Sequence, residues 1–196
     1  GEGSLRPRLT ERGMDQAQVL LSMFDQDGNP YMGDPRQVLQ ALVNRFTEKE
    51  LRPCMAVELE FSLLPKPETS EAIGAALRDQ NAVGGNLYAL SELDYHGPLL
   101  EALRQAFDTQ DLPYEGIIKE SAPSQFEINV AHSDDVMLLA DQVIRMQRTI
   151  RAVSARHGFV ASFMPKPIDD EAGNGLHVHC SLLDENGTNV FDDGGE

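Results

Sequence analysis

The chain is poor in cysteine, in basic residues and in long apolar runs. Its 196 residues include two cysteines, and 16 lysines and arginines stand against 32 aspartates and glutamates, which gives a formal net charge of -16. Such an excess of negative charge disfavours binding to nucleic acid or to an anionic membrane. No apolar run approaches the roughly 20 residues that a membrane-spanning helix needs. The polar, glycine-rich start is also unlike a signal peptide.

The two cysteines, Cys54 and Cys180, stand in apolar, strand-like stretches without the spacing of a metal site. We expect both to be reduced thiols in the core rather than a disulfide, which is typical of a cytoplasmic protein. The length suits one large domain or one and a half. The chain begins without methionine and ends on a loop-like sequence, so we expect both ends to lie inside a longer protein.

The spacing of apolar residues predicts a mixed α+β fold without internal repeats. Strands are expected at residues 19–25, 56–64, 114–120, 124–130 and 175–183. One helix is expected to begin at Asp34-Pro35, with an apolar stripe from Val38 to Phe46. Two more are expected at 98–107 and 134–157, and the second has its apolar residues at core-facing spacing: Val136, Leu139, Val143, Met146, Ile150 and Val153.

Caps and turns divide these elements. Ser133 or Asp134 is expected to cap the start of the longest helix, and Gly158 to follow its end. A turn is expected at residues 26–29, and Asn186-Gly187 predicts a hairpin leading to residues 188–191. The stretch from Lys66 to Gly85 is only weakly patterned. His96, His132 and His157 show no partner pattern, so solvated or capping roles are expected for them.

Three of the predicted strands carry apolar residues on one face and metal-ligand types on the other. Residues i and i+2 of a strand point to the same face, so ligands two residues apart can converge on one point. The polar faces comprise Glu58 and Glu60 in the first strand, Gln125, Glu127 and Asn129 in the second, and His177, His179 and Ser181 in the third. Each pair alone also suits an ordinary half-exposed strand. Together they predict a site for divalent cations, because clustered carboxylates need neutralisation.

The expected metal follows from the ligand types. Glutamates with a single imidazole favour the hard cations Mg²⁺ or Mn²⁺ over Zn²⁺, which prefers cysteine and histidine. Two such ions would clamp phosphate oxygens and polarise a carbonyl, as ATP-driven group transfer requires.

Four motifs in order, ELEF, ESAPSQFEINV, ASFMPKP and GLHVHCSL, resemble the successive active-site motifs of the glutamine synthetase superfamily. The resemblance covers roughly residues 14–196. It implies that Glu58 and Glu60 bind two different metal ions, with Glu120 and Glu127 joining Glu60 and with His177 joining Glu58. It also implies nucleotide contacts for Glu115, Asn129, His179 and Ser181, and a place for Gly173 in the loop that holds substrate glutamate.

By the same resemblance, the fold is a funnel-like, curved antiparallel sheet with helices on its outer face. Residues 1–13 would be the tail of a missing N-terminal domain or a linker, and 14–196 the N-terminal part of a catalytic domain without its C-terminal half. The implied cofactors are ATP and at least two Mg²⁺ or Mn²⁺ ions. The implied partners are glutamate, an amine or ammonia, and further copies in stacked rings. Catalytic residues would lie outside this segment, so the segment alone would be inactive.

The chain also departs from the family pattern. Family enzymes usually have Asn-Gly-Ser-Gly-Met before the first histidine, whereas residues 172–176 here are Ala-Gly-Asn-Gly-Leu, and Ser124 replaces a usual glycine. These changes favour a glutamate–amine or glutamate–polyamine ligase that forms a gamma-glutamyl phosphate. Glutamine synthesis from ammonia and a non-catalytic, glutamine synthetase-like binding or structural protein stay open as alternatives. A metal-dependent hydrolase and a guanidino kinase are weaker ones.

Overall fold

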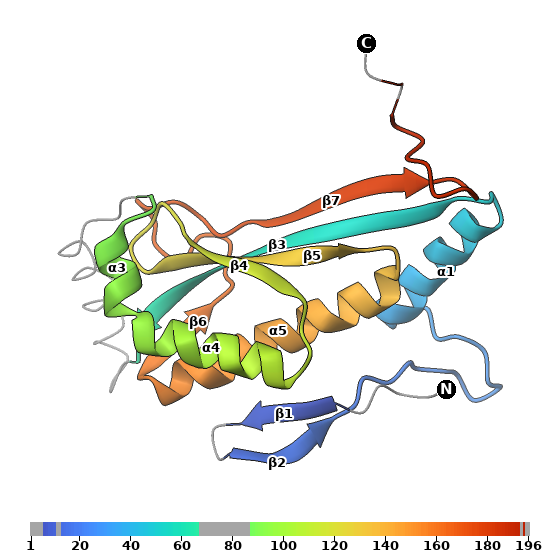
Figure 1. The fold of residues 1–196 in the computed structure, drawn as a ribbon. Helices are drawn as coiled ribbons and strands as arrows, with labels where there is room; N and C mark the ends of the chain where they lie inside the picture. The colour runs from blue at the N-terminus through green and yellow to red at the C-terminus, as the bar shows by residue number, and fades with distance from the viewer. Residues whose placement is uncertain (1–5, 11–12, 67–86, 193, 195–196) are drawn as a thin grey trace.

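The structure, a computed structural model, describes residues 6–10, 13–66, 87–192 and 194. Its centre is an antiparallel sheet with the order β4-β5-β3-β6, and β7 pairs with β3 as well. The strands are β3 (Arg52–Pro65), β4 (Tyr114–Lys119), β5 (Gln125–Ser133), β6 (Phe159–Ser162) and β7 (Leu176–Leu183). Helices α4 (Gly97–Thr109) and α5 (Val136–Arg156) pack on one face (Figure 1). The predicted α+β class with an antiparallel sheet is confirmed.

Strand β3 is long enough to serve two neighbours along one edge. Residues 52–59 pair with β7 and residues 62–65 with β6, while β5 runs along the other edge. The chain between β6 and β7 therefore leaves the sheet as a loop beside the middle of β3. This arrangement brings β5, β7 and that loop together around residues 58–62.

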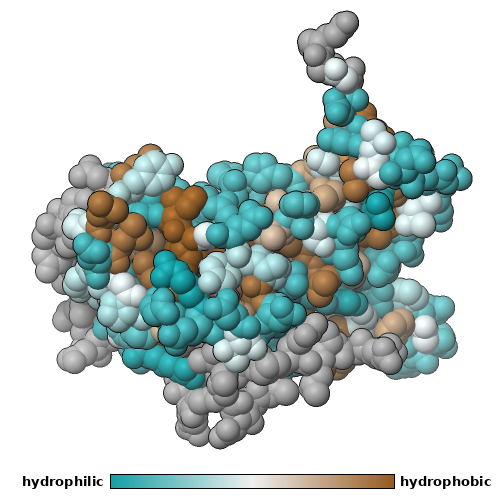
Figure 2. Space-filling view, viewed as in Figure 1, coloured by the Kyte–Doolittle hydropathy of each residue, from teal (hydrophilic) through white to brown (hydrophobic). Residues whose placement is uncertain are grey.

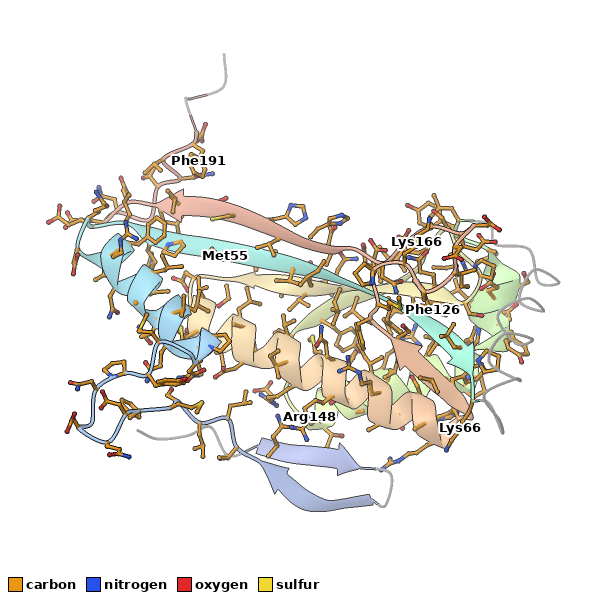
Figure 3. The ribbon with its side chains drawn as sticks, turned by 180° about the vertical axis from the view of Figure 1, so that it is seen from behind. Met55, Lys66, Phe126, Arg148, Lys166 and Phe191 are labelled. Carbon is orange, nitrogen blue, oxygen red and sulfur yellow. The ribbon has the colours of Figure 1, made fainter. Side chains whose placement is uncertain are left out.

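The core lies between the sheet and the two helices. The alternate residues of β3 and β5 that were expected to be apolar and inward are buried, and Phe61, Leu63, Phe126 and Ile128 are fully so. Figure 3 shows Phe126 between the sheet and the helix layer. The predicted inward residues of both helices are also buried: Leu99, Leu100, Leu103, Ala106 and Phe107 in α4, and Val136, Leu139, Val143, Met146, Ile150 and Val153 in α5. The polar residues of β3 and β5 consequently lie on the opposite face.

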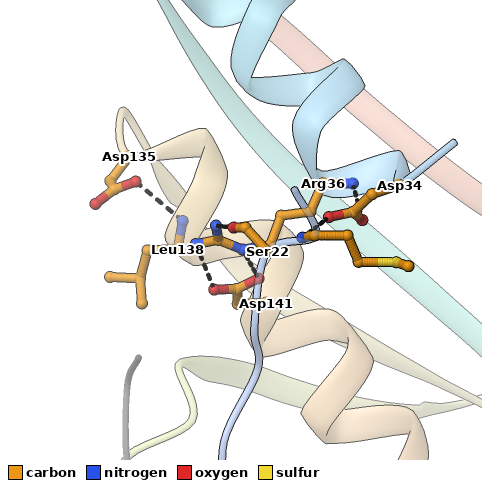
Figure 4. A network of polar contacts seen from close by, with 7 residues as sticks. Ser22, Asp34, Arg36, Asp135, Leu138 and Asp141 are labelled. Atoms are coloured by element: carbon orange, nitrogen blue, oxygen red, sulfur yellow. Dashed lines mark hydrogen bonds and ion pairs between the residues drawn. The ribbon is translucent and has the colours of Figure 1, made fainter. Parts of the chain in front are cut away.

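Helix α1 (Pro35–Thr47) begins at the predicted N-cap, because the carboxylate of Asp34 accepts a hydrogen bond from the N–H of Arg36 at 3.0 Å. Its apolar stripe is only half-buried, with Val38 and Leu42 exposed. An ion pair from Arg36 Nε to Asp141 Oδ1, 3.1 Å long, ties α1 to α5, and Arg36 also donates to Ser22 (Figure 4). Polar contacts thus supplement a weak apolar interface.

Four described elements were not predicted: β1, β2, β6 and α3. Strands β1 (Arg6–Thr10) and β2 (Gly13–Gln18) form a separate antiparallel pair beside α5, and α3 (Leu90–Tyr95) lies at the end of the sheet near β4 (Figure 1). The weakly patterned stretch lies outside the described residues apart from Lys66. In the described part of the chain, no helix has the length and apolarity to cross a membrane.

Some predicted elements were wrong in detail. Residues 19–25 form no strand, because their backbone is held by α1 instead: Asp34 accepts from the N–H of Met23, and Gln37 donates to its carbonyl. The cap of α5 is Asp135, since Ser133 still belongs to β5. The turn at residues 184–187 forms, but only Asn189 pairs beyond it, so no second strand follows.

Strand β7 is more exposed than its alternation predicts. Cys180 is exposed and Cys54 half-buried, so the expectation of two core thiols was wrong, although both are free. Val178 and Leu176 are 56% and 55% exposed. They line an apolar hollow of about 520 Å³ with Met55, Val57 and residues of α5.

The space-filling view shows how apolar residues are distributed on one side of the molecule. Hydrophilic residues cover most of it, and hydrophobic ones gather at the end that carries α3 (Figure 2). The exposed residues there include Leu87, Leu90 and Tyr95. Burial of apolar surface in this protein is therefore incomplete at both ends of the sheet.

Candidate metal centre

The register of the sheet brings the predicted ligands side by side on its open face. Glu58 of β3 pairs with Asn129 of β5 and with His177 of β7. Two residues further on, Glu60 pairs with Glu127. Directly paired residues on one face have Cβ atoms about 5 Å apart, so these side chains meet without any special loop geometry.

Glu58 lies between two histidines. Its carboxylate is 2.8 Å from His177 Nδ1 and 2.9 Å from His179 Nε2. These hydrogen bonds, that of His177 first, lower the pKa of Glu58, and the bond to Glu58 raises the pKa of His177. Both histidines are exposed, so an imidazole nitrogen is accessible to a ligand from the open face.

Glu127 completes the tightest group in the described chain. Ligand atoms of Glu58, Glu127 and His177 all lie within 4.8 Å of one another. Burial raises the pKa of Glu127, and the negative charges of Glu58, Glu120 and Glu60 add to this effect. A carboxylate that is destabilised by its neighbours gains from a cation placed among them.

Glu60 is adjacent to this group and is 9% exposed. Its Oε2 accepts a hydrogen bond from Gln125 Nε2 at 2.9 Å. On its other side is Gly175: a Cβ at this glycine would lie 2.9 Å from Glu60 Oε1 and 3.1 Å from His177 Nε2. A side chain at residue 175 would therefore push two predicted ligands out of their positions. Sequence reasoning did not single out Gly175, although its place just before the His-x-His strand was a signal.

Glu120 begins the turn between β4 and β5 and is half-buried. The turn is closed by bonds from Glu120 N to the Gln125 carbonyl and from Gln125 N to the Ala122 carbonyl. Lys119 is 1% exposed as a residue, and its ammonium donates to the carbonyls of Glu120 and Ala122. The ammonium also pairs with the buried carboxylate of Glu92 on α3, at 3.6 Å. This turn therefore rests on a buried ion pair.

Ser124, which replaces a usual glycine, has a left-handed φ of 53°. A non-glycine residue is strained there, but its N–H donates to Glu92 at 2.6 Å and its hydroxyl is 3.0 Å from His96 Nε2. His96 is 2% exposed, so it is not solvated, but it does occupy the cap position between α3 and α4, without a side-chain cap hydrogen bond. His132 and His157 are exposed, and His157 follows the end of α5.

The four predicted nucleotide-binding residues are placed differently. His179 lies against Glu58, and Asn129 donates to Glu127 Oε1 at 3.2 Å. Ser181 is on the same face of β7, further along the strand and half-buried. Glu115 is exposed at a β-bulge of β4. The structure therefore brings His179 and Asn129 to the metal group and leaves Ser181 and Glu115 at its margin.

The loop of residues 163–175 carries the predicted substrate contact, Gly173. A Cβ at Gly173 would lie 2.3 Å from the carbonyl oxygen of Pro165, so only glycine fits. The neighbouring Asn174 is fixed by its side chain: its Oδ1 accepts from Ser62 Oγ at 3.0 Å, and its Nδ2 donates to the carbonyls of Ser162 and Met164. Lys166, labelled in Figure 3, closes the loop by donating to the Glu171 carbonyl.

The residues present fit a hard divalent cation. The donors gathered on the open face are carboxylate oxygens and imidazole nitrogens, with no thiolate among them, which matches Mg²⁺ or Mn²⁺ better than Zn²⁺. Burial first, and then the like charges of Glu58, Glu120 and Glu60, raise the pKa of Glu127, so a cation would stabilise the charged form of this carboxylate.

Comparison with known proteins agrees with this geometry. Residues 23–196 match the family model described as glutamine synthetase, catalytic domain. The chain is 33% identical over 195 residues to the gamma-glutamylputrescine synthetase of Escherichia coli, covering 97% of this chain and 41% of that protein. It is also 33% identical over 177 residues to a glutamine synthetase of Halobacterium salinarum, covering 90% and 38%.

Among solved structures, one titled as a novel glutamine synthase homolog superposes with a TM-score of 0.77 at 24% identity, over 97% of this chain and 42% of that one; this likeness shows the fold alone. The chain thus spans about two fifths of these relatives. Members of the family use ATP and divalent metal ions, and take glutamate with ammonia or an amine. With its motifs, sheet register and family match in agreement, this chain belongs to the glutamine synthetase family and forms part of the catalytic domain.

Proposed function

We propose that this chain is the cation-holding part of an ATP-dependent glutamate–amine ligase. The observation that carries the proposal is the group of Glu58, Glu127 and His177, whose ligand atoms lie within 4.8 Å of one another on the open face of the sheet. Because the chain spans about two fifths of its relatives, 41% of one and 38% of another, the activity belongs to the complete protein.

Two cation positions follow from the grouping of carboxylates. Glu58 and His177 would hold one ion, and Glu60, Glu120 and Glu127 would hold the other. Glu127 is also close enough to Glu58 and His177 to lie near both ions. The bound ions would neutralise phosphate oxygens and fix the acceptor carboxylate. Protein side chains then need no unusual pKa for the chemistry, because positioning and electrostatic stabilisation carry phosphoryl transfer.

The reaction proceeds in two displacements. The gamma-carboxylate oxygen of glutamate attacks the terminal phosphorus of ATP, and ADP leaves with the electrons of the broken P–O bond. The amine nitrogen then attacks the carbonyl carbon of the resulting acyl phosphate, inorganic phosphate leaves, and the nitrogen loses a proton. His179 and Asn129 would contact the nucleotide beside the metal group, with Ser181 and Glu115 further out, and Gly173 would contact glutamate.

An amine acceptor is favoured over ammonia by the loop before β7. The asparagine that family members place for the main-chain groups of glutamate is replaced by Ala172. Asn174 does not substitute for it, since its amide is held by Ser62, Gln125 and two carbonyls of residues 162 and 164. A relative whose alignment covers 97% of this chain is named as a gamma-glutamylputrescine synthetase.

The test is an acceptor panel on the complete protein with ATP, glutamate and ADP release as readout. Diamines and monoamines should support turnover at least tenfold faster than equimolar ammonia. Fast turnover with ammonia alone would assign glutamine synthesis instead. Replacing Glu127 by Ala should abolish turnover and leave the circular-dichroism spectrum unchanged; full activity in that variant would remove Glu127 from the cation site.

The alternative of a non-catalytic relative is addressed by the same assay. A binding or structural protein would release no ADP with any acceptor. The retained carboxylate cluster argues against this alternative. Glu60 and Glu127 are only 9% and 8% exposed, and burying these charged groups costs free energy that a bound cation offsets. The complete protein is further expected to assemble as a ring-shaped homo-oligomer.

A further inference from the structure

One buried amide connects the cation group to the loop before β7. Gln125 is 1% exposed, and its Nε2 lies within hydrogen-bond distance of three acceptors: Glu60 Oε2 at 2.9 Å, the Gly173 carbonyl at 2.9 Å and Asn174 Oδ1 at 3.1 Å. Its Oε1 accepts from the N–H of Ala122 at 2.9 Å. A single side chain therefore touches a predicted metal ligand, the predicted substrate loop and the turn that carries Glu120.

The orientation of Glu60 depends on this contact. Gln125 binds Oε2, which leaves Oε1 on the side of Gly175, where His177 Nε2 is also found. In metal sites, partners that hydrogen-bond to a ligating carboxylate fix its direction and typically change metal affinity by 10–100-fold when removed. Gln125 has the position of such a partner.

Asn174 holds the other end of the connection. Its Oδ1 accepts from both Gln125 and Ser62, while its Nδ2 reaches the carbonyls of Ser162 at 3.2 Å and Met164 at 2.9 Å. Its N–H donates to the Pro165 carbonyl at 2.8 Å. These bonds anchor the loop to β3 and β5 and to the end of β6, and so set where the Gly173 carbonyl lies relative to Glu60.

We infer that Gln125 and Asn174 are positioning residues, Gln125 for both the cation and the amino-acid substrate, and Asn174 for the amino-acid substrate only. The inference rests on the proposed function, because it takes Glu60 as a cation ligand and the loop as the glutamate site. It explains why asparagine occupies the position where serine is usual: a longer amide spans from the sheet to the carbonyls of Ser162 and Met164. Serine at residue 174 lacks both the length and the second polar atom.

The experiment uses the complete protein and two independent readouts. Mn²⁺ affinity is measured by titration followed by electron paramagnetic resonance without substrates, and KM values are measured separately for glutamate and ATP. Gln125→Met should weaken Mn²⁺ binding by 10–100-fold and raise the KM for glutamate about tenfold. Asn174→Ala should raise the KM for glutamate about tenfold, with Mn²⁺ affinity and the KM for ATP changed less than twofold.

Gln110→Met is the matched control. Gln110 is also a buried glutamine, 3% exposed, and its amide donates to the Ala106 carbonyl and to Thr149 in the helix layer, away from the metal group. The Gln110→Met substitution removes a comparable buried hydrogen-bonding amide and should leave Mn²⁺ affinity and both KM values unchanged. Equal effects in Gln110→Met and Gln125→Met would show a general loss of stability and overturn the inference.

The outcomes separate the inference from the function. If the unaltered protein binds Mn²⁺ and turns over glutamate while Gln125→Met and Asn174→Ala match it, the positioning role is wrong and the proposed function stands. If the unaltered protein neither binds Mn²⁺ nor releases ADP, the proposed function fails and the inference with it. Asn174 is a half-buried loop residue, so Asn174→Ala gives a result even where Gln125→Met does not fold.

Discussion

At the scale of single residues, the least expected feature is a buried, neutral histidine behind the metal group. The ring of His96 packs edge-on against Phe126 and Phe159 and bonds to Ser124 through Nε2. Burial, with a smaller contribution from the charge of Lys119, lowers its pKa to about 4. The imidazole is consequently uncharged in the folded protein at neutral pH.

This pKa predicts a pH-dependent stability. Since the folded pKa is below the ordinary value of 6.5, the unfolded chain binds a proton between pH 6.5 and 4 that the folded chain does not. The stability gained from a neutral His96 is therefore complete above pH 6.5 and is lost as the pH falls, by about 1.4 kcal/mol per pH unit. When the pH falls from 6.5 to 5, the unfolding free energy of the unaltered protein should drop by about 2 kcal/mol more than that of His96→Gln.

The control for this prediction is His132→Gln, which changes an exposed histidine. Its pH dependence should match that of the unaltered protein. An identical slope for His96→Gln and the unaltered protein would show that His96 is protonated alike in the folded and unfolded states.

Residue-scale assignments also show what the sequence could predict. Glu58, Glu127 and His177 could be predicted as ligands because strand alternation places them on one face of the sheet. The antiparallel register of β3 with β5 and β7 then brings them side by side. The contacts of His96, Glu92 and Gln125 were not predicted. Glu92 lies in α3, and His96 directly follows this helix, which had no recognisable sequence pattern. Gln125 bonds to the loop before β7, whose conformation has no periodic signal either. Contacts between distant segments that depend on a turn conformation, as at Ser124, leave no periodic signal.

At the scale of elements, α3 supports the turn between β4 and β5 through charge. Glu92 and Lys119 are both 0% exposed in their side chains, and burial lowers the pKa of Lys119 against the opposing effect of Glu92. Removing one member of a buried pair leaves an uncompensated charge, whereas removing both restores balance.

Lys119→Met should therefore destabilise the protein by about 3–5 kcal/mol, measured by denaturant unfolding. The double variant Lys119→Met with Glu92→Gln should regain a large part of this loss. Arg104→Met, which breaks the exposed pair with Glu101, is the control and should cost less than about 1 kcal/mol. A loss in Lys119→Met no larger than in this control would contradict a structural role for the buried pair.

Element boundaries followed sequence signals where the signal was local. The Asp34 cap, the α4 stripe and the glycine after α5 are formed by neighbouring residues and were predicted. Residues 19–25 look like a strand by composition, but a strand needs a partner, and α1 holds the backbone of Met23 instead. Apolar composition alone did not distinguish a strand from an irregular segment held by α1.

At the scale of the whole molecule, the sheet ends at β7 with apolar surface exposed. Leu176, Val178, Met55 and Val57 line a hollow of about 520 Å³ between the sheet and α5. Two of these residues are more than half exposed. An uncovered strand edge beside apolar surface is prone to pair with another chain.

The chain expressed by itself should accordingly associate, as seen by light scattering during size-exclusion chromatography. Val178→Lys should lower the associated fraction at least threefold, because it places a charge in the hollow. Val190→Lys changes another exposed valine outside the hollow and should have no such effect. A monomeric unaltered chain would contradict the prediction, as would equal effects of the two substitutions.

The central claim is that carboxylates and imidazoles from β3, β5 and β7 form one site for divalent cations. It is tested most directly by titrating the complete protein with Mn²⁺, without substrates, and counting bound ions by electron paramagnetic resonance. We predict that Glu127→Gln, which keeps the shape but removes the charge, weakens binding at least tenfold, while Glu101→Gln on the exposed face of α4 leaves it unchanged. Equal Mn²⁺ affinity in Glu127→Gln and the unaltered protein would contradict the claim.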